Sequence, residues 1–155
     1  MPELPRATQR LIDAVGIDEA AIMVFPEGTK TAEDAANAIG CPVSAIVKSL
    51  VFMVEEEPVV ALVPGDKLLD TDALSAAAGG GQVRRAGLDE VRESTGYSAG
   101  GTPPFGHTTE LRVFADPSLK RNDPVWAAAG TPTSVFPITI NALDQLAAPV
   151  WEPIT

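Results

Sequence analysis

Residues 46–66 read IVKSLVFMVEEEPVVALVPGD and predict a β-hairpin. Two apolar runs, Ile46 to Val54 and Pro58 to Val63, are rich in β-branched residues, which favour strands. The three glutamates at 55–57 form an acidic turn between them. Pro64-Gly65-Asp66 then ends the second strand. The two runs are therefore expected to pair as antiparallel neighbours.

Helical and strand-like segments alternate on both sides of this hairpin. A hydroxyl and an acid three residues apart, Thr31 and Asp34, form a capping box that begins a helix ending at Gly40. The other expected helices are Pro5 to Val15, Asp70 to Ala78, Leu88 to Thr95 and Asn141 to Ala147. The other expected strands are Ala20 to Phe25 (closed by Pro26-Glu27-Gly28), Val83 to Ala86, Leu111 to Ala115 and Ser134 to Ile140, while Val125 to Ala129 reads as a helical or turn segment. This mixture predicts an α+β fold or a mixed-sheet α/β layer fold.

Length and composition predict one globular domain over residues 1–155. The chain is 45% hydrophobic and 21% charged, and it has no internal repeat. The N-terminus lacks the apolar core of a secretory signal, and no apolar run approaches the ~20 residues that span a bilayer. We therefore expect a cytoplasmic protein with no membrane partner. The single cysteine, Cys41, and single histidine, His107, exclude an intrachain disulfide and a Cys-rich zinc site, and we expect no metal and no cofactor.

The formal net charge of −10 argues against broad affinity for nucleic acid. Phosphate binding depends on Lys and Arg side chains that displace counterions, and this chain has 11 of them against 21 Asp and Glu. A small local basic pocket that holds one end of an RNA remains compatible with this balance.

Lys48 is the most informative single residue because it interrupts an apolar strand. It shares strand parity with Ile46 and Leu50, which places it on the same face as two large aliphatic side chains. Either it is a rim lysine whose stem covers apolar surface, or it is a cation that anchors an anionic or carbonyl group of a ligand. The pattern by itself favours the rim lysine.

A glycine- and proline-rich stretch, residues 96–107, cannot form a helix or a central strand. Within it, the amides of Gly100 and Gly101 are candidates to hold an oxyanion or a carboxylate; the alternative is a long structural connection. The spacing matches neither a P-loop nor a dinucleotide-binding fingerprint. His107, at the end of the stretch, is either a packing residue or a polar wall of a pocket.

Several blocks, in order, resemble the YbaK-type aminoacyl-tRNA deacylase family, which includes the editing domain of bacterial prolyl-tRNA synthetases. The blocks are residues 31–40, 46–52, 61–66, 95–106 and 128–130. The resemblance implies a mixed α/β fold with a central, mostly antiparallel, barrel-like sheet flanked by helices. It also implies hydrolysis of the ester that links a wrong amino acid to tRNA.

The family's lysine matches Lys48, and its glycine loop matches Gly100 to Gly106. The resemblance thus implies catalytic roles for Lys48, Gly100 and Gly101, with Lys48 near the substrate carbonyl or the terminal phosphate region. It implies substrate-binding roles for Phe25, Ser49, Pro104, Phe105, Gly106, His107, Gly130 and Thr131.

The expected function is a free-standing aminoacyl-tRNA deacylase that acts in trans on Cys- or Ala-tRNA(Pro)-like substrates. The expected partners are the acceptor end of aminoacyl-tRNA and, as an option, prolyl-tRNA synthetase, with the chain a monomer or a homodimer. The alternative is a non-catalytic domain that binds the aminoacyl end or has a regulatory role. Such a domain could dock on a synthetase. The presence of both Lys48 and the glycine loop favours activity.

Overall fold

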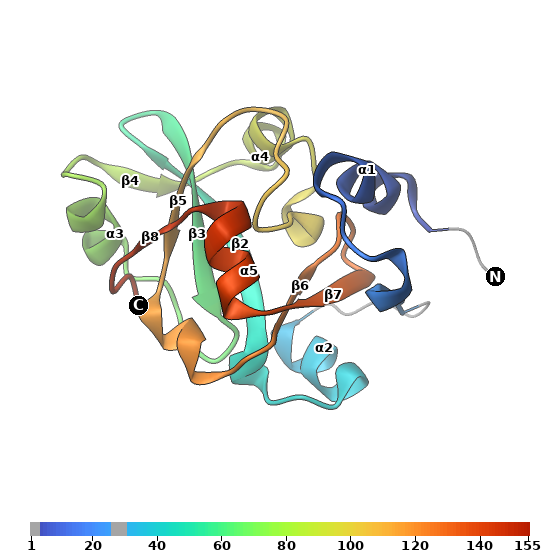
Figure 1. Ribbon diagram of the computed structural model, residues 1–155. Helices are drawn as coiled ribbons and strands as arrows, with labels where there is room; N and C mark the ends of the chain where they lie inside the picture. Colours follow the sequence, from blue (N-terminus) through green and yellow to red (C-terminus); the bar gives the residue numbers. More distant parts are fainter. Residues whose placement is uncertain (1–3, 26–30) are drawn as a thin grey trace.

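The computed structural model describes residues 4–25 and 31–155 (Figure 1). Its α-helices in this part of the chain are α1 (Arg6–Val15), α2 (Ala32–Ile39), α3 (Thr71–Ala77), α4 (Leu88–Thr95) and α5 (Ile140–Ala147). Its strands are β1 (Met23–Val24), β2 (Ile46–Val54), β3 (Glu57–Pro64), β4 (Val83–Arg85), β5 (Arg112–Ala115), β6 (Val125–Ala128), β7 (Ser134–Ile138) and β8 (Val150–Trp151). None of these helices is long and apolar enough to cross a membrane.

The predicted hairpin is confirmed. β2 and β3 pair antiparallel from Val47 opposite Pro64 to Val54 opposite Glu57. Glu55 and Glu56 form the two-residue turn, and both have positive φ, as the tightest right-twisted hairpin turns require. The hairpin forms the centre of the sheet.

The described strands form one mixed sheet in the order β1-β7-β6-β2-β3-β5-β8, with β4 paired to β2 outside this path. β1–β7, β7–β6, β2–β3 and β2–β4 are antiparallel, whereas β2–β6, β3–β5 and β5–β8 are parallel. The expected mixed α/β class is confirmed. The sheet is open rather than closed like a barrel, because the path ends at β1 on one side and β8 on the other among the described strands.

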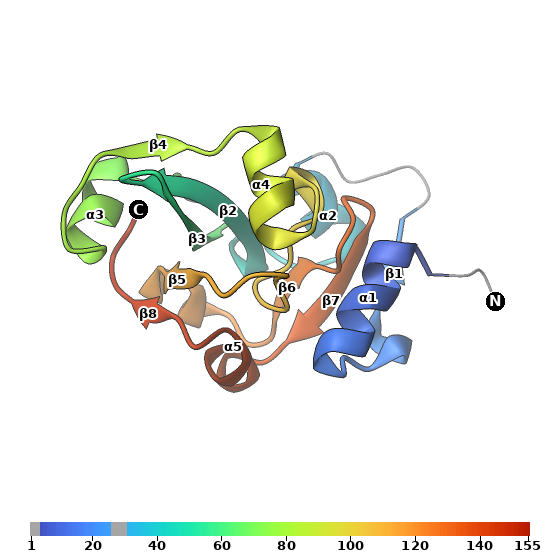
Figure 2. The ribbon, with the colours of Figure 1, turned by 90° about the horizontal axis from the view of Figure 1, so that it is seen from above.

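Helices cover both faces of this sheet. One face carries the larger core, to which α1, α4 and α5 contribute Leu11, Val91 and Leu143. The opposite face carries two smaller clusters, one against α3 with Leu74 and one against α2 with Ala35. Figure 2 shows α5 and α2 on opposite sides of the strands. Residues of β2 therefore find packing partners on both faces, which explains why its sequence is nearly continuous in apolar residues.

Two sequence predictions on single segments are wrong. Val125 to Ala129, expected as helix or turn, contains strand β6, because β2 and β7 pair with it from both sides and override the helix propensity of its alanines. Of Ala20 to Phe25, only Met23–Val24 is a strand, because Asp18 caps a short 3₁₀ turn over Glu19–Ala21. The expected turn at 26–28 lies outside the described residues.

Pro137 is tolerated in β7 because of where the neighbouring strands end. Its residue partner in β6 is Trp126, whereas β1 pairs only with Ser134 and Val135 on the other side. Pro137 thus lies beyond the end of β1, at an edge position where a missing N–H breaks no ladder. This agrees with the expectation of an edge or broken strand.

Candidate functional site

The sheet is split beside the middle of β2. On the side opposite β3, β6 pairs with Ile46 and Val47 and β4 pairs with Phe52 to Val54. In the described residues no strand pairs with β2 between these two, at positions 48–51. The Val51 carbonyl accepts the Ala86 N–H on this side. Backbone groups alternate direction along a strand, so those of Ser49 point into the same gap.

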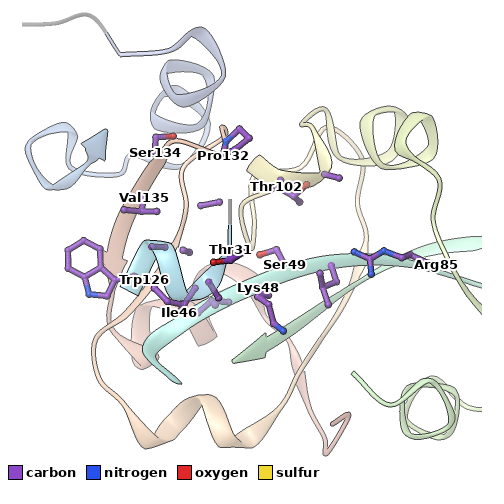
Figure 3. A pocket seen from close by; sticks show the side chains of 18 residues that line it. Thr31, Ile46, Lys48, Ser49, Arg85, Thr102, Trp126, Pro132, Ser134 and Val135 are labelled. Atoms are coloured by element: carbon purple, nitrogen blue, oxygen red, sulfur yellow. The ribbon is translucent and has the colours of Figure 1, made fainter. Parts of the chain in front are cut away.

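A pocket with a volume of about 310 Å³ occupies this gap (Figure 3). β2, β6 and β7 form its floor and sides, the start of α2 closes one end, and the 3₁₀ turn Ala99–Gly101 forms the facing wall. The lining residues are Thr31, Ala32, Ala35, Ile46, Val47, Lys48, Ser49, Leu50, Arg85, Ala99, Gly100, Thr102, Trp126, Ala127, Ala128, Pro132, Ser134 and Val135.

Lys48 lies in this lining, half-buried between the two smaller core clusters. Its Nζ donates to the Lys67 carbonyl oxygen at 2.7 Å. Burial lowers the pKa of its ammonium; the Asp66 carboxylate opposes this shift and the Arg85 guanidinium adds to it. Asp66 is itself bound by Arg121 at 2.8 and 3.0 Å. The Lys48 charge therefore has a carbonyl partner but no ion pair among the described residues.

Ser49 carries a buried hydroxyl without a partner. The residue is 8% exposed, and its Oγ, alone among the buried side-chain polar atoms of the described chain, has no hydrogen bond. Leaving such a group unsatisfied costs about 1–3 kcal/mol. Figure 3 shows the Ser49 hydroxyl on the pocket side of β2. Buried polar groups are rarely left without a partner, so a ligand or a water in the pocket is the expected partner of this hydroxyl.

The other hydroxyls of the pocket are satisfied within the protein. Thr102 Oγ1 donates to the Ser98 carbonyl at 2.8 Å, and Ser134 Oγ bonds to Thr131 Oγ1 at 2.7 Å and Thr8 Oγ1 at 3.0 Å. These bonds hold the walls in place. Thr31 Oγ1, also in the lining, accepts the Asp34 N–H at 3.0 Å, so Ser49 has the one lining hydroxyl without a hydrogen bond among the described residues.

The two predicted glycine elements meet each other. A Cβ on Gly101 would lie 2.5 Å from the Thr131 Cα, so only glycine allows this approach of the 99–101 turn to Gly130-Thr131. The Gly101 N–H donates to the Ser98 carbonyl at 3.0 Å, whereas Gly100 lines the pocket. Of the two glycines whose amides are predicted to hold an oxyanion, Gly100 is the one that lines the cavity.

The remaining predicted residues lie behind or beside the lining. Phe105 is buried in the larger core, with its ring centroid 5.9 Å from that of Phe136. His107 Nε2 donates to the Pro103 carbonyl at 2.8 Å, and burial lowers its pKa although this bond opposes the shift. Phe25 donates its N–H to the Thr133 carbonyl at 2.7 Å. Together with Pro104, Gly106, Gly130 and Thr131, these residues are outside the lining, and Thr131 supports it through Ser134.

Sequence reasoning missed Arg85, Trp126 and Thr102 as lining residues. Trp126 lies in a segment expected as helix, and Thr102 in the loop is not distinguished from its neighbours by any pattern. Arg85 carried a usable signal, since Arg84-Arg85 is one of only two consecutive basic pairs in an acidic chain.

The pocket is cationic although the protein is acidic. Lys48 and Arg85 line it, and none of the described lining residues is Asp or Glu. No described cluster of His, Cys, Asp and Glu could hold a metal ion. The fold and the pocket thus define a small mixed α/β domain with a cationic pocket at a break in its sheet.

Comparison with known proteins identifies the family. The family model described as "Aminoacyl-tRNA editing domain" matches residues 26–146. The chain belongs to this family, which confirms the resemblance seen in the sequence.

The relatives differ in size. The uncharacterized protein YwhH of Bacillus subtilis (strain 168) is 35% identical over 135 residues, 86% of this chain and 85% of that protein. The proline–tRNA ligase of Maridesulfovibrio salexigens is 38% identical over 96 residues, 62% of this chain but only 16% of the ligase. A crystal structure of a proposed trans-editing enzyme for prolyl tRNA synthetase superposes with a TM-score of 0.90 at 36% identity and covers 99% of both chains.

Proposed function

We propose that the chain is a free-standing trans-editing aminoacyl-tRNA deacylase, a hydrolase of carboxylic esters that acts on mischarged tRNA. The observation that carries this proposal is the β2 edge, where the consecutive residues Lys48 and Ser49, a cation and an unpartnered hydroxyl, both line a pocket without described carboxylates. Membership of the editing-domain family supports it. The free-standing form is supported by the uncharacterized protein YwhH, 85% of whose length matches this chain. Translation takes place in the cytoplasm, which is the location we propose.

The proposed reaction needs positioning and charge stabilisation rather than a strong nucleophile. Water attacks the ester carbonyl carbon, the bond to the ribose oxygen breaks, and the proton of the water passes to the leaving hydroxyl. In this proposal the amide of Gly100, a lining residue, stabilises the tetrahedral oxyanion, and Lys48 and Ser49 hold the aminoacylated end. The described lining contains no His, Cys, Asp or Glu, so we propose that a hydroxyl of the substrate orients the water.

The amino-acid class follows from the apolar end of the pocket. Ile46, Trp126, Ala128 and Val135 line it, and none of them can pair with a charged side chain. A volume of about 310 Å³ is at the low end for ligand pockets. We therefore propose small uncharged residues as substrates, of the Cys- or Ala-tRNA(Pro) kind. Substrates that differ by one small group are discriminated only weakly by a pocket. The choice between Cys and Ala is therefore made by the experiment below.

The test is deacylation of a panel of mischarged tRNAs: Cys-tRNA(Pro), Ala-tRNA(Pro), Ser-tRNA and Thr-tRNA. We expect hydrolysis of one member, and loss of turnover in Lys48→Ala with the fold intact. Lys120→Ala is the matched control, because Lys120 is exposed and stacks on Trp151, outside the pocket. Equal turnover in Lys48→Ala and the wild type would remove the role of Lys48.

A second candidate function has one observation in its favour, the lack of His, Cys, Asp and Glu in the described lining. The chain would then be a non-catalytic domain that binds the aminoacyl end of the tRNA, or a regulatory domain. In either case it would dock on prolyl-tRNA synthetase. Binding of mischarged tRNA with an unchanged spontaneous rate of ester loss would support this candidate over the hydrolase. Sedimentation with and without the synthetase tests docking and separates monomer from homodimer.

A further inference from the structure

Arg85 is an exposed cation on the pocket rim without a partner among the described residues. Its neighbour Arg84 is bound by Glu56 at 2.6 Å and Glu90 at 2.7 Å. Arg121 is bound by Asp66, and Arg112 donates to the Ala78 carbonyl and lies over the Phe114 ring. Arg6 and Arg92 are likewise exposed and without a partner among the described residues, but of these three arginines Arg85 is the one that lines the pocket.

The fold aims this guanidinium along the open edge of β2. Arg85 is the last residue of β4 and pairs with Phe52, where the gap beside β2 ends. Figure 3 shows its side chain running back over the strand toward Ser49 and Lys48. The pocket thus has an apolar end at Trp126, a middle at Lys48 and Ser49, and a cationic exit at Arg85.

Electrostatics links the two cations. The guanidinium of Arg85 contributes to lowering the pKa of Lys48, so the two charges act on one another across the pocket. Like charges held close destabilise each other, and an anion placed between or beside them relieves this repulsion. The Asp66 carboxylate offsets part of this repulsion at Lys48, but it lies outside the described lining and is bound by Arg121. The lining itself has no described carboxylate, so an anionic group of a ligand is the partner that fits between the two cations.

We propose that Arg85 binds a backbone phosphate of the RNA strand as it leaves the pocket, while the aminoacylated terminus lies at Lys48 and Ser49. This inference rests on the proposed deacylase function and adds the contact that recognises the nucleic acid. A pocket of about 310 Å³ accommodates an aminoacyl ester with little more than its sugar, so the next phosphates lie at the exit. The planar fork of arginine suits phosphate oxygens, which it binds with two parallel hydrogen bonds.

The test compares two esters of the same amino acid that differ in phosphate content: an aminoacyl-adenosine without phosphate and an aminoacylated acceptor-stem minihelix. We expect Arg85→Gln to raise KM for the minihelix about tenfold with kcat unchanged, and Arg85→Lys to recover part of it. Hydrolysis of the aminoacyl-adenosine should be unchanged. In a plot of the logarithm of the minihelix binding constant against the logarithm of the salt concentration, the slope for Arg85→Gln should be shallower by about 0.7–0.9. This is the change expected when one phosphate contact is lost.

Arg92→Gln is the matched control, because Arg92 is an exposed arginine on α4 outside the pocket and its loss makes the same change in net charge. If Arg85→Gln hydrolyses the minihelix ester with the same KM and kcat as the wild type, the proposal is overturned. An equal loss of kcat/KM on both esters would also overturn the proposal, because Arg85 would then act at the ester itself.

Failure of the proposed function is distinguishable from failure of this inference. If the wild type hydrolyses neither ester, binding of the uncharged minihelix is measured instead by fluorescence anisotropy. Weaker binding by Arg85→Gln but not by Arg92→Gln supports the phosphate contact without any turnover. Equal binding by all three proteins would overturn it.

Discussion

At the scale of single residues, Ser49 combines a cost to stability with a role at the pocket. Its hydroxyl is buried and unpaired. Ser49→Ala removes the unpaired group, so we expect the free energy of unfolding to rise by about 1 kcal/mol while deacylation falls. Urea denaturation and turnover of the same preparation measure both quantities.

Ser134→Ala is the control, since the Ser134 hydroxyl is buried and bonds to Thr8, Thr131 and the Ala129 carbonyl. The free energy of unfolding of this variant should fall by about 1–2 kcal/mol, because the substitution leaves the hydrogen-bond partners of Ser134 unpaired. Destabilisation of Ser49→Ala to the same extent would show that its hydroxyl has a partner inside the protein.

His107 makes stability depend on pH. Burial lowers its pKa in the folded state, so the unfolded chain binds a proton more readily near the ordinary value of about 6.5. Its contribution to stability is complete above that value and is lost as pH falls toward the lowered folded pKa.

We therefore expect the urea midpoint to fall between about pH 7 and pH 5, and to fall less in His107→Gln. His107 is the only histidine, so no other imidazole contributes to the difference. Parallel pH profiles for the two proteins would show that His107 titrates alike in both states.

At the scale of elements, the pocket wall depends on contact between two loops. A Cβ on Gly101 would meet backbone atoms of Thr131 and Gly130 at 2.5–2.8 Å, whereas a Cβ on Gly100 would meet only Pro132 side-chain atoms, the nearest at 3.2 Å. We expect Gly101→Ala to lower the free energy of unfolding by about 1–3 kcal/mol and to lower deacylation activity, because the added methyl group separates the two loops.

Gly100→Ala is the matched control and should change stability by less than about 1 kcal/mol. Thermal unfolding and deacylation of both variants measure the difference. Similar stability losses at both positions would mean that the loops do not pack as the contact between Gly101 and Thr131 requires.

The element scale also shows where sequence reasoning succeeds. The β2–β3 hairpin, the Thr31 cap and the glycine stop at Gly40 follow from local chemistry and are confirmed. Val125–Ala128 was misjudged because its strand state depends on β2 and β7, about 80 residues before it and a few residues after it.

At the scale of the whole molecule, charge distribution limits affinity for RNA. The chain has a formal net charge of −10, and its pocket has two described cations. Two phosphate contacts give a log–log salt slope no steeper than about −1.4 on a single strand. We expect weak minihelix binding that falls by about sevenfold or less between about 50 and 200 mM salt.

Fluorescence anisotropy over this salt range measures the slope. Strong binding that salt leaves unchanged would contradict the expectation, as would a slope beyond about −3, which needs more cations than the pocket offers. The proline–tRNA ligase relatives carry the matching region as 16–18% of a longer chain, so a synthetase surface is a source of further RNA affinity that this experiment leaves out.

The sequence by itself determined the hairpin, the α/β class, the family and the candidacy of Lys48 and the glycine loop, because short-range patterns and ordered motifs carry that information. Only the tertiary structure showed that β4 and β6 leave part of β2 unpaired, that Ser49 is an orphan there, and that Arg85 reaches the same gap. It also separated Gly100, at the cavity, from Phe105 and His107 behind it. These facts depend on which distant segments pair with β2, and no local pattern encodes such pairing.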